Sequence, residues 1–225
     1  MKAAVIHGQA HKGSTYHLSH MLLDKLNCSK EEVSEFYVNG VEDCIGCFKC
    51  IIQSENLCPH RGQIEDIILA IEEADVIVIA SPTYVFSMSG QLKTFFDHMG
   101  YRWMSHRPHP AMKNKIGVAI STAAGAGAKN TTKQIAEQMF WWGVGKTYCL
   151  SLTVAAMGWH EVEDKRKAKA DKAIEKLART IVNRVGCVTP GIKTRFMFFI
   201  MKQMQKGKGY NMVDVKHWRE NGWIK

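Results

Sequence analysis

The sequence contains no hydrophobic stretch long enough to span a membrane. Its apolar runs all fall short of the roughly 18 to 20 residues that a membrane helix needs. The beginning of the chain also lacks the pattern of a signal peptide, because Met1 and Lys2 lead directly into a short apolar run that ends at Gly8. We therefore expect a cytoplasmic protein without a membrane partner, whose thiols are kept reduced.

Internal repeats, low-complexity segments and recognisable nucleic-acid motifs are absent as well. The net charge is nonetheless +9, and residues 188–225 carry eight Lys/Arg against two acidic residues. Such a basic segment can attract anionic cofactors, acidic partners or nucleic acid. Since no nucleic-acid motif accompanies it, we interpret the segment as a solvated basic surface and expect no nucleic-acid partner.

The 225 residues, of which 46% are hydrophobic, suffice for one domain with an appendage. Short apolar runs without alternation are typical of parallel strands that are buried on both faces. Helical segments with one apolar face separate these runs. The alternation predicts a doubly wound α/β fold, with strands at 2–7, 32–38, 76–80, 115–121 and 146–154 and helices at 16–26, 63–73, 92–99, 131–142 and 161–185.

The alternating pattern ends at Pro190 and Gly191. We therefore divide the chain into a domain of residues 1–187 and a basic helical extension of residues 188–225. Residues 192–205 combine Phe, Met and Ile with Lys and Arg. This composition suits a helix packed on its own domain or on a second subunit, and also suits a helix on a membrane surface. We favour the packed helix.

Three loops are expected to meet at the carboxyl edge of the sheet, where open α/β sheets bind ligands. Residues 8–15 lead into a helix whose N-terminus favours a phosphate, although simple helix capping is an alternative. Residues 81–87 offer two aromatic rings and several hydroxyls, which suit a flat ligand with polar edges. Residues 121–128 are small and allow a close approach of the backbone. We expect the loop 101–112 to lie over the same edge.

One segment carries a specific resemblance to a known family. Residues Ser81-Pro82-x-Tyr84, then Ser89-Gly90-Gln91-Leu92-Lys93 and Phe96-Asp97, resemble the NADPH-dependent FMN reductase and iron–sulfur flavoprotein branch of the flavodoxin-like superfamily. The resemblance extends over roughly residues 1–155. It implies a flavodoxin-like five-stranded sheet of order 2-1-3-4-5 with FMN at its switch point. The chain departs from the family at Gly8-Gln9-Ala10-His11, where Gly-Ser-Pro-Arg is common, and at Asp97-His98, where Asp-Arg is usual.

The resemblance also implies which residues hold the flavin. Its first loop would bind the FMN phosphate through Ser14 and Thr15, with His11 and Lys12 beside them. The second loop would hold the isoalloxazine ring and the ribityl chain through Pro82, Thr83, Tyr84, Phe86 and Ser87. The third would touch the ring edge through Thr122, Gly125 and Gly127. No catalytic acid or base is named, because the flavin itself carries the redox chemistry.

Four of the seven cysteines lie close together as Cys44-x2-Cys47-x2-Cys50-x7-Cys58, and the last of them precedes Pro59. In a reducing compartment this pattern indicates a metal or redox site rather than disulfides. A fourth cysteine before a proline is a ferredoxin-like ending. The resemblance implies one [4Fe–4S] cluster beside the flavin. Zinc, which also takes four cysteines, and free or redox-active thiols are the alternatives.

Three functions are consistent with these features. The preferred one is an FMN-dependent oxidoreductase that passes reducing equivalents from NAD(P)H to a flavin, a quinone or another small acceptor. The second is an iron–sulfur flavoprotein electron carrier that is fed by ferredoxin and has no nicotinamide site. The third is a non-enzymatic, metal-stabilised interaction protein. The family and the apolar C-terminal helix also imply a homo-oligomer, a dimer or tetramer, in which residues 101–112 or 190–225 cover a partner's site.

Overall fold

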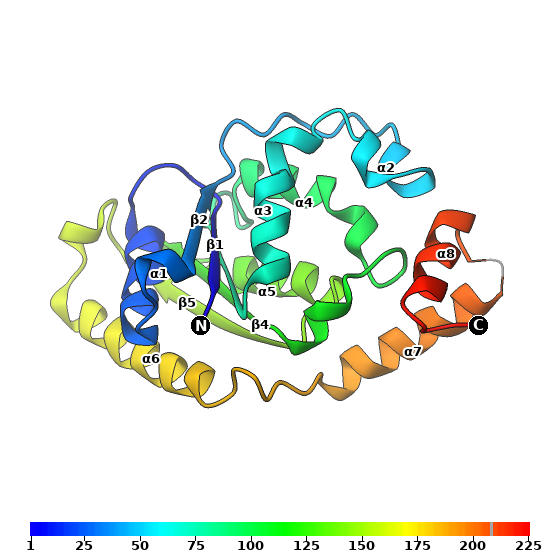
Figure 1. Ribbon diagram of the computed structural model, residues 1–225. Coiled ribbons are helices and arrows are strands. Elements are labelled where there is room, and N and C mark those ends of the chain that lie inside the picture. Colours follow the sequence, from blue (N-terminus) through cyan, green and yellow to red (C-terminus); the bar gives the residue numbers. More distant parts are fainter. Residues whose placement is uncertain (208) are drawn as a thin grey trace.

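The computed structural model, which describes residues 1–207 and 209–225, contains a five-stranded sheet in the order β2-β1-β3-β4-β5 (Figure 1). All four strand pairings are parallel. The predicted doubly wound, flavodoxin-like fold is thereby confirmed. Lys208, which the sequence counts among the basic residues of the extension, lies outside the described residues. The strands are β1 (Ala3–His7), β2 (Val33–Tyr37), β3 (Val76–Ala80), β4 (Ile116–Ala123) and β5 (Lys146–Thr153).

The helices follow the predicted segments to within a few residues at each end. Two helices form where no helical segment was predicted: α2 lies among the cysteines, and α8 lies near the end of the extension. The helices are α1 (Ser14–Leu26), α2 (Lys49–Ile52), α3 (Arg61–Glu73), α4 (Gly90–His98), α5 (Ala128–Trp141), α6 (Asp164–Val182), α7 (Ile192–Lys206) and α8 (Met212–Glu220). Among the described residues, no helix is both long and apolar enough to cross a membrane.

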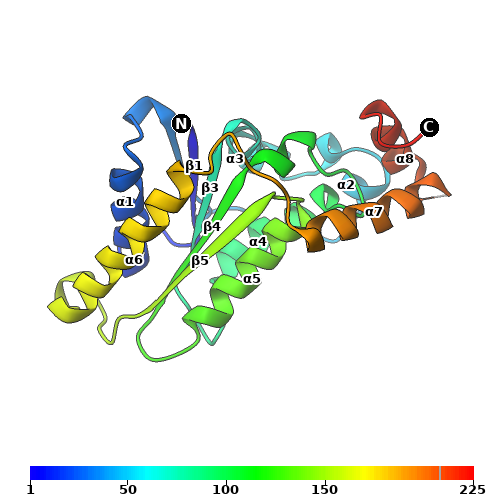
Figure 2. The same cartoon turned by 90° about the horizontal axis from the view of Figure 1, so that it is seen from below.

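Helices cover both faces of the sheet, with α1 and α6 on one face and α3, α4 and α5 on the other (Figure 2). Successive residues of a strand point to opposite faces. Val76 and Val78 therefore pack toward α1 and α6, whereas Ile77 and Ile79 pack toward α3 to α5. Because both sets are buried, the run from Val76 to Ala80 is apolar at every position.

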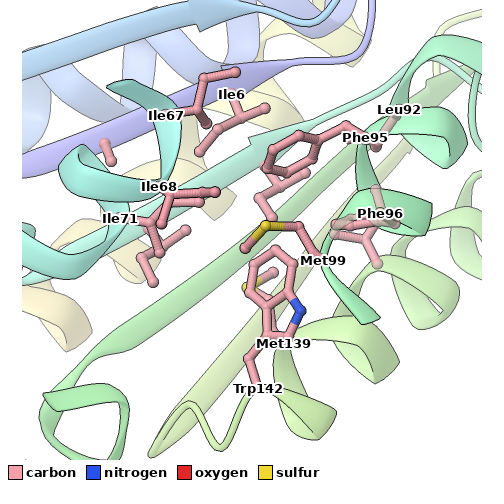
Figure 3. Packing of buried hydrophobic residues seen from close by; sticks show 14 of the residues in the cluster. Ile6, Ile67, Ile68, Ile71, Leu92, Phe95, Phe96, Met99, Met139 and Trp142 are labelled. Carbon is pink, nitrogen blue, oxygen red and sulfur yellow. The ribbon is translucent and has the colours of Figure 1, made fainter. Parts of the chain in front are cut away.

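The cluster on the α3–α5 face is filled by isoleucine and aromatic side chains (Figure 3). The predicted stripe on α3 is fully buried and consists of Ile64, Ile67, Ile68 and Ile71. Trp142 packs edge-on against Phe95 and Phe96, with ring centroids 6.4 and 5.6 Å away. Each such buried side chain stabilises the fold by roughly 1.5 to 3 kcal/mol. This packing holds α4, and with it the loop that precedes α4, firmly on the sheet.

Strand β4 is longer than predicted, and this changes the place of one expected binding residue. The strand was expected to end at Ser121, but it continues to Ala123 because all its eight residues pair with β5. Thr122 therefore lies on the strand and is almost fully buried. The flexible loop begins only at Ala124.

The prediction that residues 101–112 lie over the carboxyl edge is wrong. This segment runs from the end of α4 to the amino end of β4, at the opposite edge of the sheet. The Met104 amide donates to the Trp141 carbonyl, next to the start of β5. Just beyond the segment, Lys115 Nζ donates to the carbonyls of Glu72 and Ala74, close to the start of β3. The aromatic residues of this segment thus pack against helix ends and not against a ligand edge.

The extension forms two helices that pack against residues 104–109 at the far end of the molecule from α1 and α6 (Figure 1). Met104, Met201, Val215, Trp218 and Ile224 make a separate buried cluster there. The Trp218 indole donates to the His106 carbonyl at 2.6 Å. Trp218 and Trp223 anchor the end of the chain, because Trp218 stacks on Phe198 of α7 and Trp223 packs edge-on against the same ring.

Candidate functional site at the carboxyl edge of the sheet

The first loop delivers an uncapped helix N-terminus to the carboxyl edge. Gly13 is the N-cap of α1, and no side chain caps the first turn. The first N–H groups of a helix have no partner within the helix, so they are available to an anion. Ser14 and Thr15 are buried in the first turn. The hydroxyls of Thr15 and Thr122 are 2.6 Å apart, so this bond joins the first loop to the end of β4.

Two basic residues of the first loop lie at its surface. The ring of exposed His11 folds over Gly13, where a Cβ atom would come within 2.8 Å of the imidazole. Lys12 places its ammonium over the Tyr16 ring, 5.4 Å from the ring centroid. His11 therefore lies beside the helix N-terminus, while Lys12 is directed toward Tyr16. A hollow in this region is lined by residues of the first loop together with His7, Ala80 and Pro82.

The second loop contains a tight turn that projects its side chains outward. Tyr84 and Ser87 exchange two backbone hydrogen bonds of 2.9 and 3.0 Å. The two residues between them, Val85 and Phe86, have φ angles of +49° and +61°, which are unusual for bulky side chains. Phe86 is 66% exposed and Tyr84 is 42% exposed. Rings held outward at a strained turn can stack on a flat ligand.

The turn is held in place by hydroxyl and amide groups of β4 and α5. The Thr83 hydroxyl lies 3.0 Å from the hydroxyls of both Ser121 and Thr131. Ser87 Oγ donates to the Gln134 side chain at 2.8 Å, and the Asn130 amide donates to the Phe86 carbonyl at 2.9 Å. The second loop is thereby fixed against the third.

Gly127 is the point where the second and third loops touch. Its φ angle is +99°, and a Cβ atom there would come within 2.8 Å of Thr83 and 3.2 Å of Phe86. Both the backbone conformation and the close approach require glycine. Gly125 is exposed, and a Cβ atom there would meet no heavy atom within 4 Å. The structure thus brings Thr122 and Gly127 to the first two loops and leaves Gly125 open to solvent.

The serines of the family-like segment are structural. Ser81 and Ser89 are fully buried. Ser89 Oγ donates to the Gly8 carbonyl at 2.6 Å, and the Ser89 amide donates to Ser81 Oγ at 3.0 Å. Ser89 also caps α4 by accepting from the Leu92 amide. These bonds tie the first loop, the end of β3 and the start of α4 together, so the two serines shape the site without facing a ligand.

The four cysteines lie near one another on the segment that contains α2. Cys44 and Cys47 are exposed, while Cys50 and Cys58 are partly buried. Burial, together with Cys58, Cys44 and Cys47, raises the pKa of the Cys50 thiol to about 11. Among the described residues, no three cysteine sulfurs lie within 4.8 Å of one another. Four thiolates on one zinc ion would be closer than this, since the Zn–S bond is about 2.3 Å.

His98, at the end of α4, is a neighbour of the cysteines that the sequence did not reveal. Its Nδ1 lies 3.8 Å from Cys58 Sγ, and its Nε2 donates to the Glu42 carbonyl at 2.8 Å. The ring is almost fully buried. The one available signal was the replacement of the usual arginine after Asp97 by histidine. Helix α4 thus begins just after the second loop and ends at His98 beside Cys58, and at 1.5 Å per residue it spans about 13 Å.

Arg107 is a second neighbour that sequence reasoning missed. Its buried guanidinium donates to the carbonyls of Cys50 and Ile51. It also pairs with Asp214 of α8 at 2.6 Å and with Glu55 at 3.3 Å. Asn211 adds a further bond to the Ile51 carbonyl. The C-terminal extension and the cysteine segment are therefore locked to each other.

The fold and its three converging loops define a flavodoxin-like protein, whose ligand edge lies where strand order reverses between β1 and β3. Comparison with known proteins gives the family. Residues 1–160 match the NADPH-dependent FMN reductase family, and the chain belongs to it. It is an FMN-dependent oxidoreductase. This membership argues against the non-enzymatic interpretation.

Curated relatives include several flavoproteins. An iron–sulfur flavoprotein of Archaeoglobus fulgidus is 26% identical over 230 residues, which cover all of both chains. An iron–sulfur flavoprotein of Methanocaldococcus jannaschii is 31% identical over 122 residues, covering 51% of this chain and 60% of the relative. An FMN-dependent NADH:quinone oxidoreductase of Burkholderia pseudomallei is 33% identical over 66 residues, covering 27% of this chain and 33% of the relative.

Solved structures agree on the fold. A flavone reductase superposes with a TM-score of 0.59 at 17% identity, covering 85% of this chain and 66% of that chain. An FMN-dependent NADH-azoreductase from Bacillus anthracis, solved in complex with FMN, gives a TM-score of 0.54 at 12% identity. That superposition covers 79% of this chain and all of the azoreductase.

Proposed function

We propose that the carboxyl-edge loops bind FMN and that the enzyme passes reducing equivalents from NAD(P)H to a small acceptor. One observation carries the assignment of the site. The uncapped N-terminus of α1 lies against the buried hydroxyl pair of Thr15 and Thr122. Such an arrangement suits a phosphate, because it offers free N–H groups, a helix dipole and hydroxyl groups. Ser14 and Thr15 would hold the phosphate, and His11 would lie beside it.

The second and third loops would hold the rest of the flavin. Tyr84 and Phe86 offer exposed ring faces, and Pro82, Thr83 and Ser87 supply backbone and hydroxyl groups around them. Gly127 permits the close contact between the loops, and Thr122 and Gly125 border it. Bound FMN would supply the chemistry of hydride acceptance from a nicotinamide and of electron release singly or in pairs. The protein's part is to orient the ring and to limit access to it.

We propose that Cys44, Cys47, Cys50 and Cys58 hold a [4Fe–4S] cluster. The spacing supports this, as does the mutual influence of the four thiols on the pKa of Cys50. Among the described residues, no three of these sulfurs are gathered within 4.8 Å of one another, so the choice of a cluster rests on the cysteine spacing. The relatives named iron–sulfur flavoproteins agree with this choice. The bonds from Arg107 and the contact of His98 with Cys58 would orient the ligands.

A second candidate function is an electron carrier that receives electrons from ferredoxin. The exposed cysteine segment favours it, because Ile45, Phe48, Ile52 and Leu57 surround the cysteines and are all more than half exposed. An exposed apolar surface of this kind marks a contact site for a partner. This surface, and separately the exposed Phe196 and Phe199 of α7, also suit contact with a second copy of this chain, in keeping with a dimer or tetramer.

Steady-state oxidation of NADH and NADPH by the anaerobically purified protein separates the two candidates. We expect turnover with a nicotinamide and a quinone, free flavin or dye as acceptor. A kcat of the order of 1 s⁻¹ or more would place the protein among ordinary enzymes. No nicotinamide oxidation, together with rapid flavin reduction by reduced ferredoxin, would instead establish the carrier.

We further propose that residues 188–225 act as an extension that fixes the cysteine segment, as the contacts of Asn211 and Asp214 suggest. Deletion of residues 190–225 would then change the number of subunits in the assembly, measured by its sedimentation mass. It would also change the reactivity of the four clustered cysteines toward thiol reagents. An unchanged mass would count against a role in oligomerisation.

A further inference from the structure

A cluster of two histidines and one glutamate lies beside the first loop and has no part in the function proposed above. His7 is the last residue of β1, His20 lies on α1, and Glu35 lies on the edge strand β2. His7 Nε2 is 2.7 Å from Glu35 Oε1, and His20 Nε2 is 2.8 Å from the same oxygen. Three elements that are distant in sequence thus direct nitrogen and oxygen atoms at one point.

The rings are held in this orientation by stacking. His7 stacks on Tyr37, with ring centroids 4.8 Å apart and planes 19° apart. Tyr16 lies one turn before His20 on α1, and its ring centroid is 4.0 Å from that of His20. The planes of His7 and His20 are within 8° of parallel. Aromatic neighbours on both sides therefore limit how the two imidazoles can turn.

The donor set matches a transition-metal site. The three ligand atoms all lie within 4.8 Å of one another, and among the described residues this is the one group of its kind. Two histidines and one carboxylate are the protein ligands of several zinc sites that keep an open fourth position. With bonds of about 2.0 to 2.2 Å, a tetrahedral zinc ion would separate these atoms by about 3.3 Å. The present contacts would have to open by only about half an ångström.

The three side chains also differ in their exposure to solvent, as a metal site open to solvent requires. His7 is buried, with 3% of its side chain exposed, while His20 and Glu35 are 33% and 28% exposed. A cation could therefore reach the site from solvent and find one fixed ligand and two that can adjust. We propose that His7, His20 and Glu35 bind a divalent transition-metal ion, with Zn²⁺ as the preferred ion because imidazole and carboxylate suit it.

The three residues lie close to the first loop, so a bound metal ion would affect the charge there. His7 is followed directly by Gly8 and lines the same hollow as Gln9, Gly13 and Thr15. A bound cation would add positive charge beside the α1 N-terminus. The proposal itself does not depend on FMN, because metal binding can be measured on the flavin-free protein.

The test is zinc binding by full-length protein that has been stripped with EDTA and then dialysed against ZnCl2. Because the cysteines could also bind zinc, wild type is compared with the Glu35→Gln and His20→Ala variants. His160→Ala is the control, since His160 is an exposed histidine outside the cluster. We expect each cluster variant to bind one zinc ion fewer per chain, or to bind that ion at least about 10-fold more weakly, since loss of a supporting group alone costs 10- to 100-fold.

Cobalt substitution identifies the ligands directly. Co²⁺ at a histidine–carboxylate site gives weak visible bands, whereas Co²⁺ bound to thiolates adds an intense near-ultraviolet charge-transfer band. We expect the weak bands to disappear in Glu35→Gln and to persist in His160→Ala. Equal zinc content and equal zinc affinity in wild type and Glu35→Gln, or cobalt spectra showing thiolate ligation alone, would overturn the proposal and leave the cluster as a hydrogen-bonded network.

Discussion

Replacing Arg107 with methionine is expected to lower the free energy of unfolding by about 3 to 5 kcal/mol. The substitution removes one partner of a buried ion pair and leaves the Asp214 carboxylate, which is fully buried, without its cationic partner. It also removes the donors to the Cys50 and Ile51 carbonyls. The measurement is urea unfolding followed by tryptophan fluorescence, since Trp218 lies buried on α8, the same helix that bears Asp214.

A double-mutant cycle separates the charge from the packing. Asp214→Asn keeps a side chain of the same shape, so His106 and Asn211 can still be accommodated. Combining it with Arg107→Met removes both charges, and the loss in the double variant should be clearly smaller than the sum of the single losses. Lys93→Met, which breaks an exposed pair with Asp97, is the control and should cost no more than about 1 kcal/mol. A loss for Arg107→Met no larger than for this control would mean that Arg107 does not hold α8 and the cysteine segment together.

Ser14→Asp is expected to weaken FMN binding by at least about 100-fold while leaving the fold intact. Asp is favourable in the first turn of a helix, so the substitution should not destabilise α1. The new carboxylate would lie at the proposed phosphate position, where two unit charges about 4 Å apart repel by about 4 kcal/mol near a protein surface. Titration of FMN fluorescence against the apoprotein measures the effect.

Riboflavin, which has no phosphate, is the matched ligand. Its affinity should change little in Ser14→Asp, because the repulsion acts on the phosphate alone. Ser29→Asp is the matched protein variant, since Ser29 is an exposed N-cap of a different helical turn. An equal loss of FMN and riboflavin affinity in Ser14→Asp would mean that the phosphate lies elsewhere.

Much of the fold could be predicted from the sequence, because a strand that is buried on both faces of a sheet is apolar at every position. The apolar run from Val76 to Ala80 can be placed only inside the sheet. The isoleucine stripe of α3 can be placed only against a face of the sheet. The end of β4 was less certain, since Thr122 and Ala123 are small and suit a loop equally well. Pairing with β5 decides their conformation, and pairing is a property of the sheet and not of the segment.

The site was predictable where it depends on loops at strand ends and unpredictable where it depends on packing between distant segments. The convergence of Thr15 with Thr122, and of Thr83 with Gly127, follows from the strand order. The aromatic loop 101–112 was misplaced because its composition resembles that of a ligand-binding loop, although its contacts lie at the amino edge. His98 beside Cys58 became visible only in three dimensions, across 40 residues of sequence.

The central claim is that this enzyme holds FMN at the carboxyl edge and an iron–sulfur cluster at its four clustered cysteines. The most direct test is the visible spectrum of anaerobically purified protein, with flavin, iron and acid-labile sulfide determined on the same sample. We expect flavin bands on a broad shoulder, with about four iron and about four sulfide per chain. Flavin without iron would contradict the cluster, and colourless protein that takes up no added FMN would contradict the account as a whole.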